Sequence, residues 1–184
     1  MSVVNVKIKK LYEDTILPTR ADNGSAGMDL YAHLNNDYMR VIKPHTTEMI
    51  SVGFAMETPN NTYGAIFARS GLASKKGLRP ANSVGVVDST YRGEVFVALH
   101  NDTDTPQQIM NGDRIAQMII MEYPTVGIIE TDTLSETERG NGGFGSSGVN
   151  WYGMDNISVS SIWSDNFRCS FRMVYWNYLC SLWM

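Results

Sequence analysis

The chain has 184 residues, the length of a single domain that buries roughly two-thirds of its unfolded surface. Its formal net charge of −4 argues against a nucleic-acid polymer as partner, although a phosphorylated small molecule needs only a few local cations. No stretch approaches the ~18 uncharged apolar residues of a membrane span, and the first residues lack a signal-peptide core, so we expect a soluble, cytoplasmic protein that contacts no membrane.

Short strands separated by turn residues fill the first part of the chain. Residues 3–11 alternate between apolar and polar side chains, which is typical of a strand with one wet face. Further strands are predicted at residues 26–32, 48–56 and 63–68, with Pro, Gly and Asn between them, and this spacing indicates a β-sandwich or barrel. Asp29 lies where a loop enters a strand, and a carboxylate there either bonds backbone N–H groups or serves a function.

One short helix is predicted among the strands, at residues 70–77. Ser70 is expected at the N-cap, helix formers follow it, and Gly77 is expected at the C-terminal end. Together with Arg69 and Gly71, this segment offers a guanidinium, a hydroxyl and backbone N–H groups, which suit a phosphate oxygen. An ordinary capped turn with a surface arginine is the alternative.

A polar turn joins two apolar segments in the middle of the chain. Residues 84–87 are apolar and end in Asp88, and residues 94–99 resume an alternating pattern, so we predict a β-hairpin with Asp88 at its rim. A carboxylate there can orient or deprotonate a water molecule, and Tyr91 can present its flat face to a ring. The alternative is that Asp88 only caps the turn through backbone N–H groups.

Three more strands are predicted before the composition changes. Residues 95–100 are expected to pair with residues 107–110, and residues 115–121 and 126–131 form further strands. Gln117 is a lone amide in an apolar strand, where leaving it unpaired would cost about 1–3 kcal/mol. It therefore faces a wet edge, a ligand or another chain.

Residues 139–148 contain five glycines in ten positions and cannot hold a fixed shape alone. Their arginine, phenylalanine and two serines suit a segment that folds over an anionic ligand carrying a flat base. We therefore predict a lid that the ligand orders, with a flexible tail as the alternative.

Beyond residue 148 the sequence loses any clear period, and residues 149–184 hold all four tryptophans and both cysteines. The late cysteines argue against a disulfide framework and agree with a reducing compartment. An exposed run this aromatic is an aggregation hazard, so the segment either docks on a partner or on its own subunit, or is an accidental read-through. We assign it no function and place the domain boundary after residue 148.

Five stretches of the chain, taken in order, resemble the five motifs of the trimeric deoxyuridine triphosphate nucleotidohydrolases, the dUTPases. The resemblance covers roughly residues 1–148, and five motifs in one order are a strong signal. It implies an all-β fold, a distorted β-barrel or jelly roll of short strands with one short helix. It also implies a homotrimer with shared active sites, in which the C-terminal arm is exchanged between subunits. The five stretches are Ser25–Leu30, Ala68–Ala73, Asn82–Glu94, Gly112–Met118 and Arg139–Gly148.

The same resemblance implies an enzyme that hydrolyses dUTP to dUMP and pyrophosphate, which limits uracil in DNA and supplies dUMP for thymidylate synthesis. Asp88 matches the catalytic residue, which activates the water that attacks the α-phosphorus. Tyr91 matches the ring that packs under the deoxyribose and leaves no room for a 2′-hydroxyl. Mg²⁺ is held mainly by the triphosphate, and Asp29 matches an acid that supports it through water.

The remaining substrate contacts also follow from the resemblance. Phosphate contacts are expected from Arg69, Ser70, Gly71 and Gln117, uracil contacts from Asn82, Val86, Val87, Phe96 and the Asp88 backbone, and lid contacts from Arg139, Phe144, Gly145, Ser146 and Ser147.

Two other functions remain open. The dCTP deaminases share the fold and resemble the second and third motifs, but they need a glutamate as proton shuttle and usually lack the Tyr91-Arg92-Gly93 sequence. A nucleotide-binding regulatory module, with its lid blocked by residues 149–184, would bind dUTP without turning it over.

Overall fold

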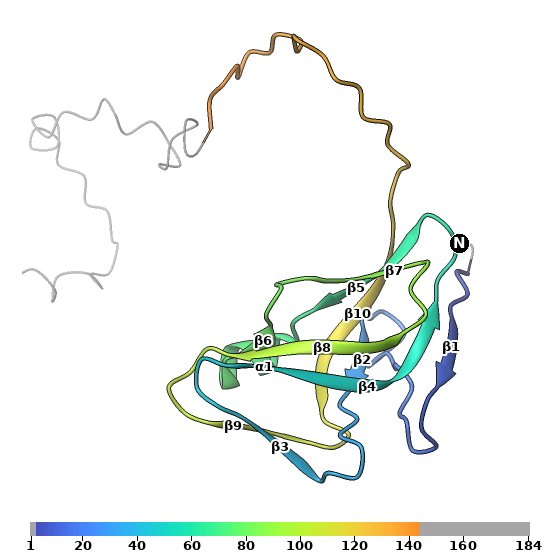
Figure 1. Cartoon of the computed structure of the whole chain (residues 1–184), viewed down its shortest axis with the longest axis vertical. Coiled ribbons are helices and arrows are strands. Elements are labelled where there is room, and N and C mark those ends of the chain that lie inside the picture. The colour runs from blue at the N-terminus through green and yellow to red at the C-terminus, as the bar shows by residue number, and fades with distance from the viewer. Residues whose placement is uncertain (1–2, 144–184) are drawn as a thin grey trace, which may run out of the picture. The chain divides into compact units, whose positions relative to one another are not determined.

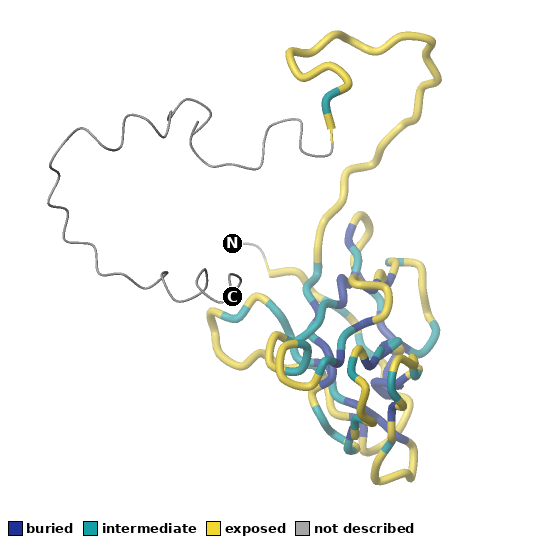
Figure 2. The backbone as a smooth tube through the Cα atoms, turned by 90° about the vertical axis from the view of Figure 1, so that its left-hand side faces the viewer, coloured by how far each residue is buried: buried dark blue, intermediate teal, exposed yellow. Residues whose placement is uncertain are grey.

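A computed structural model describes residues 3–143, and the chain divides into two units, Met1–Ile128 and Ile129–Met184. The described part of the first unit is built from strands and one short helix (Figure 1), so the predicted all-β class is confirmed. In the second unit, residues 129–143 form no helix or strand and are almost entirely exposed (Figure 2). Among residues 3–143, no helix has the length and apolar character needed to cross a membrane.

The described residues contain ten strands and one helix. These are β1 Lys7–Lys10, β2 Met28–Tyr31, β3 Met39–Ile42, β4 Thr47–Glu57, β5 Thr62–Phe67, α1 Ser70–Lys76, β6 Leu78–Pro80, β7 Gly85–Asp88, β8 Glu94–Asn101, β9 Gln107–Met110 and β10 Arg114–Glu122.

The strands form two four-stranded antiparallel sheets and one two-stranded ribbon. The first sheet has the order β1-β4-β8-β6, the second has the order β2-β10-β5-β7, and β3 pairs with β9. Among the described residues the sheets do not close into a barrel. The hydrophobic core draws on both sheets, with alternate residues of β8, Val95, Val97 and Leu99, packed against residues such as Leu30 of β2 and Met118 of β10.

Two predicted strand pairings are wrong. The segments predicted as a hairpin around Asp88 lie in different sheets, because β7 pairs with β5 while β8 pairs with β4 and β6. A turn joins them, in which the Tyr91 N–H donates to the Asp88 carbonyl at 3.1 Å. Strand β9 pairs with β3, a strand that the sequence did not reveal, and not with residues 95–100. Apolar alternation shows which face of a strand is buried, but it does not identify the neighbouring strand.

Several element boundaries also differ from expectation. Only Lys7–Lys10 of the first predicted strand forms a ladder, β6 was not predicted, and residues 126–131 form no strand in this chain. The N-cap of α1 is Arg69, which makes no side-chain capping bond, so Ser70 is the first helical residue. Gly77 ends the helix as predicted, in the left-handed region at φ 62°.

A bulge in β4 is centred on Gly53, which has a φ of 76°. The ladder to β8 shifts here, since Ser51 faces Phe96 and Ala55 faces Glu94, so four steps along β4 match two along β8. The Gly53 carbonyl accepts hydrogen bonds from the Leu11 N–H at 3.0 Å and the Thr15 hydroxyl at 2.8 Å. The bulge is therefore fixed by the segment that follows β1.

Replacing Gly53 with Ala places a Cβ 2.7 Å from Thr15 Oγ1 and forces a side chain into the left-handed region. We expect the free energy of unfolding, measured by urea denaturation, to fall by about 1–3 kcal/mol. Gly127→Ala is the matched control, because nothing lies within 4 Å of its added Cβ. Equal stability of the two variants would contradict the description of this bulge.

Candidate active site

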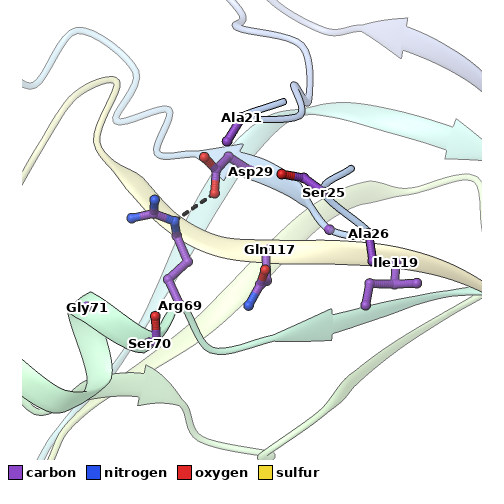
Figure 3. A pocket seen from close by; sticks show the side chains of 10 residues that line it. Ala21, Ser25, Ala26, Asp29, Arg69, Ser70, Gly71, Gln117 and Ile119 are labelled. Atoms are coloured by element: carbon purple, nitrogen blue, oxygen red, sulfur yellow. Dashed lines mark hydrogen bonds and ion pairs between the residues drawn. The ribbon is translucent and has the colours of Figure 1, made fainter. Parts of the chain in front are cut away.

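A pocket of about 540 Å³ opens where β2, β10 and the start of α1 meet (Figure 3). It brings together residues of three of the five motifs, which are separated by up to 92 positions in the sequence. That separation is the difference between positions 25 and 117, both of which line the pocket. The lining residues are Ala21, Ser25, Ala26, Gly27, Asp29, Arg69, Ser70, Gly71, Gln117 and Ile119.

Asp29 is the centre of charge in this pocket. Its Oδ1 accepts a hydrogen bond from Arg69 Nε at 2.7 Å (Figure 3), and its Oδ2 accepts one from Arg114 at 3.2 Å. The carboxylate therefore accepts hydrogen bonds from two guanidinium groups, and not from the backbone N–H groups that the sequence offered as one alternative. The Asp29 side chain is only 12% exposed, and its ion pair with Arg69, which is 26% exposed, is more shielded from water than that with Arg114, which is 51% exposed. Arg69 and Asp29 are the charged side chains that line this pocket, and Arg114 contacts Asp29 from outside the lining.

Gln117 of β10 finds the partner that its burial requires. Its Nε2 donates to the Ala68 carbonyl at 2.9 Å, so the expectation that this amide must be paired is confirmed. The side chain passes directly over Gly27, where a Cβ would lie 2.6 Å from Gln117 Oε1. A glycine is therefore required at position 27 for this arrangement.

Ser70 and Gly71 enter the pocket as the first two residues of α1. The N–H groups of a first helical turn have no helical carbonyl to bond. Together with the Ser70 hydroxyl they provide neutral donors beside the Arg69 guanidinium.

A second pocket, of about 240 Å³, lies around the end of β7 and the start of β8. Asp88 is the last residue of β7 and is exposed, as predicted for a rim carboxylate. Asn82 does not line this pocket. It lies near the start of β7, since its amide nitrogen would be 3.5 Å from a Cβ added to Gly85. The lining residues are Met49, Val86, Val87, Asp88, Tyr91, Glu94, Val95 and Phe96.

The turn between β7 and β8 is held by side-chain bonds to its own backbone. The Tyr91 hydroxyl donates to the Glu94 carbonyl at 3.0 Å. Arg92 donates to the carbonyls of Ser89 at 2.6 Å and Tyr91 at 2.9 Å. Arg92 also lies 3.6 Å from Glu57, and the hydrogen bond from Lys7, with the positive charges of Lys7 and Arg92, holds the pKa of Glu57 below its usual value.

Strand β5 separates the two pockets. Gln117 faces Phe67 at one end of β5, whereas Asp88 faces Tyr63 at the other end and on the opposite edge. Four residues of an extended strand span about 13 Å. The lining residues of the two pockets do not overlap. One chain therefore presents two separate pockets.

The predicted lid lies mostly outside the described residues. Arg139 is described, and its Nε donates to the Gly142 carbonyl at 2.7 Å. Phe144, Gly145, Ser146 and Ser147 lie beyond the described range, as do residues 149–184. Their roles stay predictions.

Residues 3–143 contain no group of three or more His, Cys, Asp or Glu side chains that could hold a metal ion. Asp29 is the sole carboxylate lining the first pocket, and each of its oxygens already accepts a bond from an arginine. A divalent cation there would take most of its ligands from water and from a bound anion. A divalent cation therefore fits this pocket only when a bound anion brings the ion with it.

Sequence reasoning missed Arg114 and Glu94 as parts of these sites. Both lie inside the motifs that the sequence singled out, so the signal was present. Their partners, however, are 85 and 43 positions away, and only the folded strands bring them together.

The fold and its two pockets define an all-β protein that can bind an anion in one pocket and a ring beside a carboxylate in the other. A sequence model of the dUTPase family matches residues 13–148, well over half of the chain. The chain therefore belongs to the dUTPase family, whose named relatives are hydrolases.

Relatives and solved structures agree with this assignment. The deoxyuridine 5′-triphosphate nucleotidohydrolase of Orientia tsutsugamushi is 44% identical over 149 residues, covering 79% of this chain and 99% of the relative. That of Desulfitobacterium hafniense is 46% identical over 152 residues, covering 81% and 99%. The dUTPase of Staphylococcus bacteriophage 80alpha, solved with dUPNHPP, aligns with a TM-score of 0.71 and 26% identity over 79% of this chain and 99% of that one.

Replacing Asp29 with Asn keeps the shape of the side chain but removes the charge that Arg69 and Arg114 bind. We expect the free energy of unfolding, measured with EDTA present, to fall by about 1–3 kcal/mol because two guanidinium groups lose their anion. Asp132→Asn is the matched control, since Asp132 is exposed and makes no ion pair within the described residues. A side chain that acts only through a metal ion would leave the stability in EDTA unchanged, which would contradict this account.

Proposed function

We propose that the chain hydrolyses dUTP to dUMP and pyrophosphate at sites shared between the subunits of a homotrimer. The observation that carries the proposal is the pair of half-sites on either side of β5. One has the carboxylate and ring suited to a nucleoside, and the other has the Arg69 guanidinium and neutral donors suited to a triphosphate. A second subunit can bring its Arg69 pocket against the Asp88 pocket of the first, which one chain cannot do alone.

Asp88 is the catalytic residue of this proposal. An exposed carboxylate at the end of a rigid strand can accept a hydrogen bond from a water molecule and take its proton. The water oxygen then forms a bond to the α-phosphorus, and the bond to the bridging oxygen breaks with its electron pair leaving on pyrophosphate. The products are dUMP and pyrophosphate.

Tyr91 and the neighbouring backbone select the nucleoside. The ring of Tyr91 is fixed by its bond to the Glu94 carbonyl and forms one wall of the Asp88 pocket. Packed under the sugar, it leaves no room for a 2′-hydroxyl, so UTP is excluded by steric clash. Backbone groups near Val86 and Phe96 pair with uracil, so the cytosine amino group meets a donor and the thymine methyl meets the strand. Asn82 lies beside the base.

The Arg69 pocket holds the phosphates. The bond to Asp29 uses only Nε of Arg69, so its two terminal nitrogens can donate to phosphate oxygens. The Ser70 hydroxyl, the Gly71 N–H and the Gln117 amide add neutral donors. Mg²⁺, when bound, would neutralise part of the triphosphate charge while keeping several of its waters, one of which Asp29 can contact.

A lid from a neighbouring subunit completes the site. Arg139 contacts the γ-phosphate, Phe144 stacks on the base, and Gly145 lets the backbone approach while Ser146 and Ser147 bond phosphate oxygens. Closing the lid excludes water and fixes the triphosphate, so it affects turnover more than binding.

Replacing Asp88 with Asn removes the base but keeps the shape of the pocket. We expect pyrophosphate release from dUTP to fall by about 10²–10⁴-fold, because that is the usual contribution of a positioned general base. The dissociation constant for dUTP, measured by calorimetry, should change by less than about threefold because Asp88 makes no predicted phosphate contact. Asp132→Asn is the matched control, and hydrolysis by Asp88→Asn at the parent rate would refute the proposal.

A substrate series separates the proposal from its alternatives. The full chain should release pyrophosphate from dUTP at least about a hundredfold faster than from UTP, dCTP or dTTP. Ammonia released from dCTP, without pyrophosphate from dUTP, would indicate a deaminase. Binding of dUTP without turnover, restored by truncation after residue 148, would indicate a regulatory module instead.

A further inference from the structure

The backbone and the side chain of Glu94 form hydrogen bonds with different parts of the chain. Its carbonyl accepts the hydrogen bond of the Tyr91 hydroxyl at 3.0 Å, while its carboxylate accepts a hydrogen bond from Ser51 Oγ on β4. Glu94 is the first residue of β8, where it pairs with Ala55 on the far side of the β4 bulge. The Ser51 bond therefore holds the end of β8 that fixes Tyr91.

Ser51 itself is held in place by the β4 bulge. It is only 6% exposed, and its Oγ accepts the Gly53 N–H at 2.8 Å while donating to Glu94. In a regular ladder the Gly53 N–H would face a backbone carbonyl. The left-handed conformation of Gly53 turns this N–H toward Ser51 instead, so the Ser51 hydroxyl both donates and accepts a hydrogen bond.

Gly93 shows how closely the Tyr91 ring is seated. A Cβ at position 93 would lie 2.6 Å from Tyr91 Cζ and 3.1 Å from Cε2, so the ring rests directly on the backbone between Tyr91 and Glu94. A displacement of Glu94 would move its carbonyl, which holds the Tyr91 hydroxyl. It would also move the adjoining backbone of Gly93, which supports the Tyr91 ring. Ser51, which lines neither pocket, is thus hydrogen-bonded to the residue whose carbonyl holds the Tyr91 hydroxyl.

We propose that Ser51 and Glu94 are positioning residues that determine sugar specificity by fixing the orientation of the Tyr91 ring. This inference rests on the proposed function, since it concerns the ring that excludes a 2′-hydroxyl. Neither side chain touches the reacting atoms. Without the Ser51 bond, the start of β8 shifts, the ring loses its single orientation, and a ribose fits where only a deoxyribose fitted before.

The test compares the ratio of kcat/KM for dUTP to kcat/KM for UTP in three variants. Ser51→Ala and Glu94→Ala both break the bond, and we expect the ratio to fall by about tenfold or more, mainly through faster use of UTP. Glu94→Gln keeps an oxygen that accepts from Ser51, so it should retain the parent ratio within about twofold. Glu13→Gln is the matched control, because Glu13 is exposed and lines neither pocket.

A role in stability alone would lower the unfolding temperature of Ser51→Ala without changing the ratio, and that result would overturn the proposal. A fall in the kcat/KM ratio for Glu94→Gln as large as that for Glu94→Ala would also overturn the proposal, because the hydrogen bond from Ser51 would then be irrelevant.

A binding measurement separates this inference from the proposed function. The ratio of dissociation constants for UDP and dUDP, measured by calorimetry, reports sugar selection without turnover. A parent chain that releases no pyrophosphate refutes the proposed function, yet a drop of this ratio in Ser51→Ala would still support the positioning role. A ratio unchanged by Ser51→Ala, or near one in the parent chain, contradicts it.

Discussion

Strand β5 imposes the constraint on which the rest of this site depends. It holds β10, with Gln117, on one edge and β7, with Asp88, on the other, and its register places these two residues at opposite ends. The extended backbone cannot shorten that separation. In the proposed function, the Asp88 carboxylate and the Arg69 guanidinium act on one triphosphate, so their separation within a chain requires that a second subunit supply one of them.

Hydrogen bonds within the chain hold side chains of both pockets in place. Asp29 orients Arg69 from a sheltered position, and Ser51 fixes Glu94 and through it Tyr91. Asp29, Asp88 and Gln117 lie on strands, and Ser70 begins a short helix, so rigid elements hold their backbones. Their conformational entropy is largely lost on folding, so ligand binding has less ordering to oppose it.

The sequence motifs predicted several of the residues that line the two pockets. Asp29, Arg69 and Gln117 do line one pocket, and Asp88 and Tyr91 do line another. Strand pairing could not be predicted, because alternation of apolar residues does not identify a neighbour, and a hairpin was expected where two sheets meet. The pairing of Ser51 with Glu94 spans 43 positions and depends on an irregular bulge, which no local pattern reveals.

The shared site is tested most directly by mixing two variants, Asp88→Asn and Arg69→Ala, each of which should be nearly inactive alone. After the two are unfolded and refolded together in equal amounts, random trimers should recover about a quarter of the parent rate of pyrophosphate release, because one interface in four then has both native residues. If Asp88 and Arg69 act within the same chain, every site lacks one of them. A mixture no more active than its components would contradict the account.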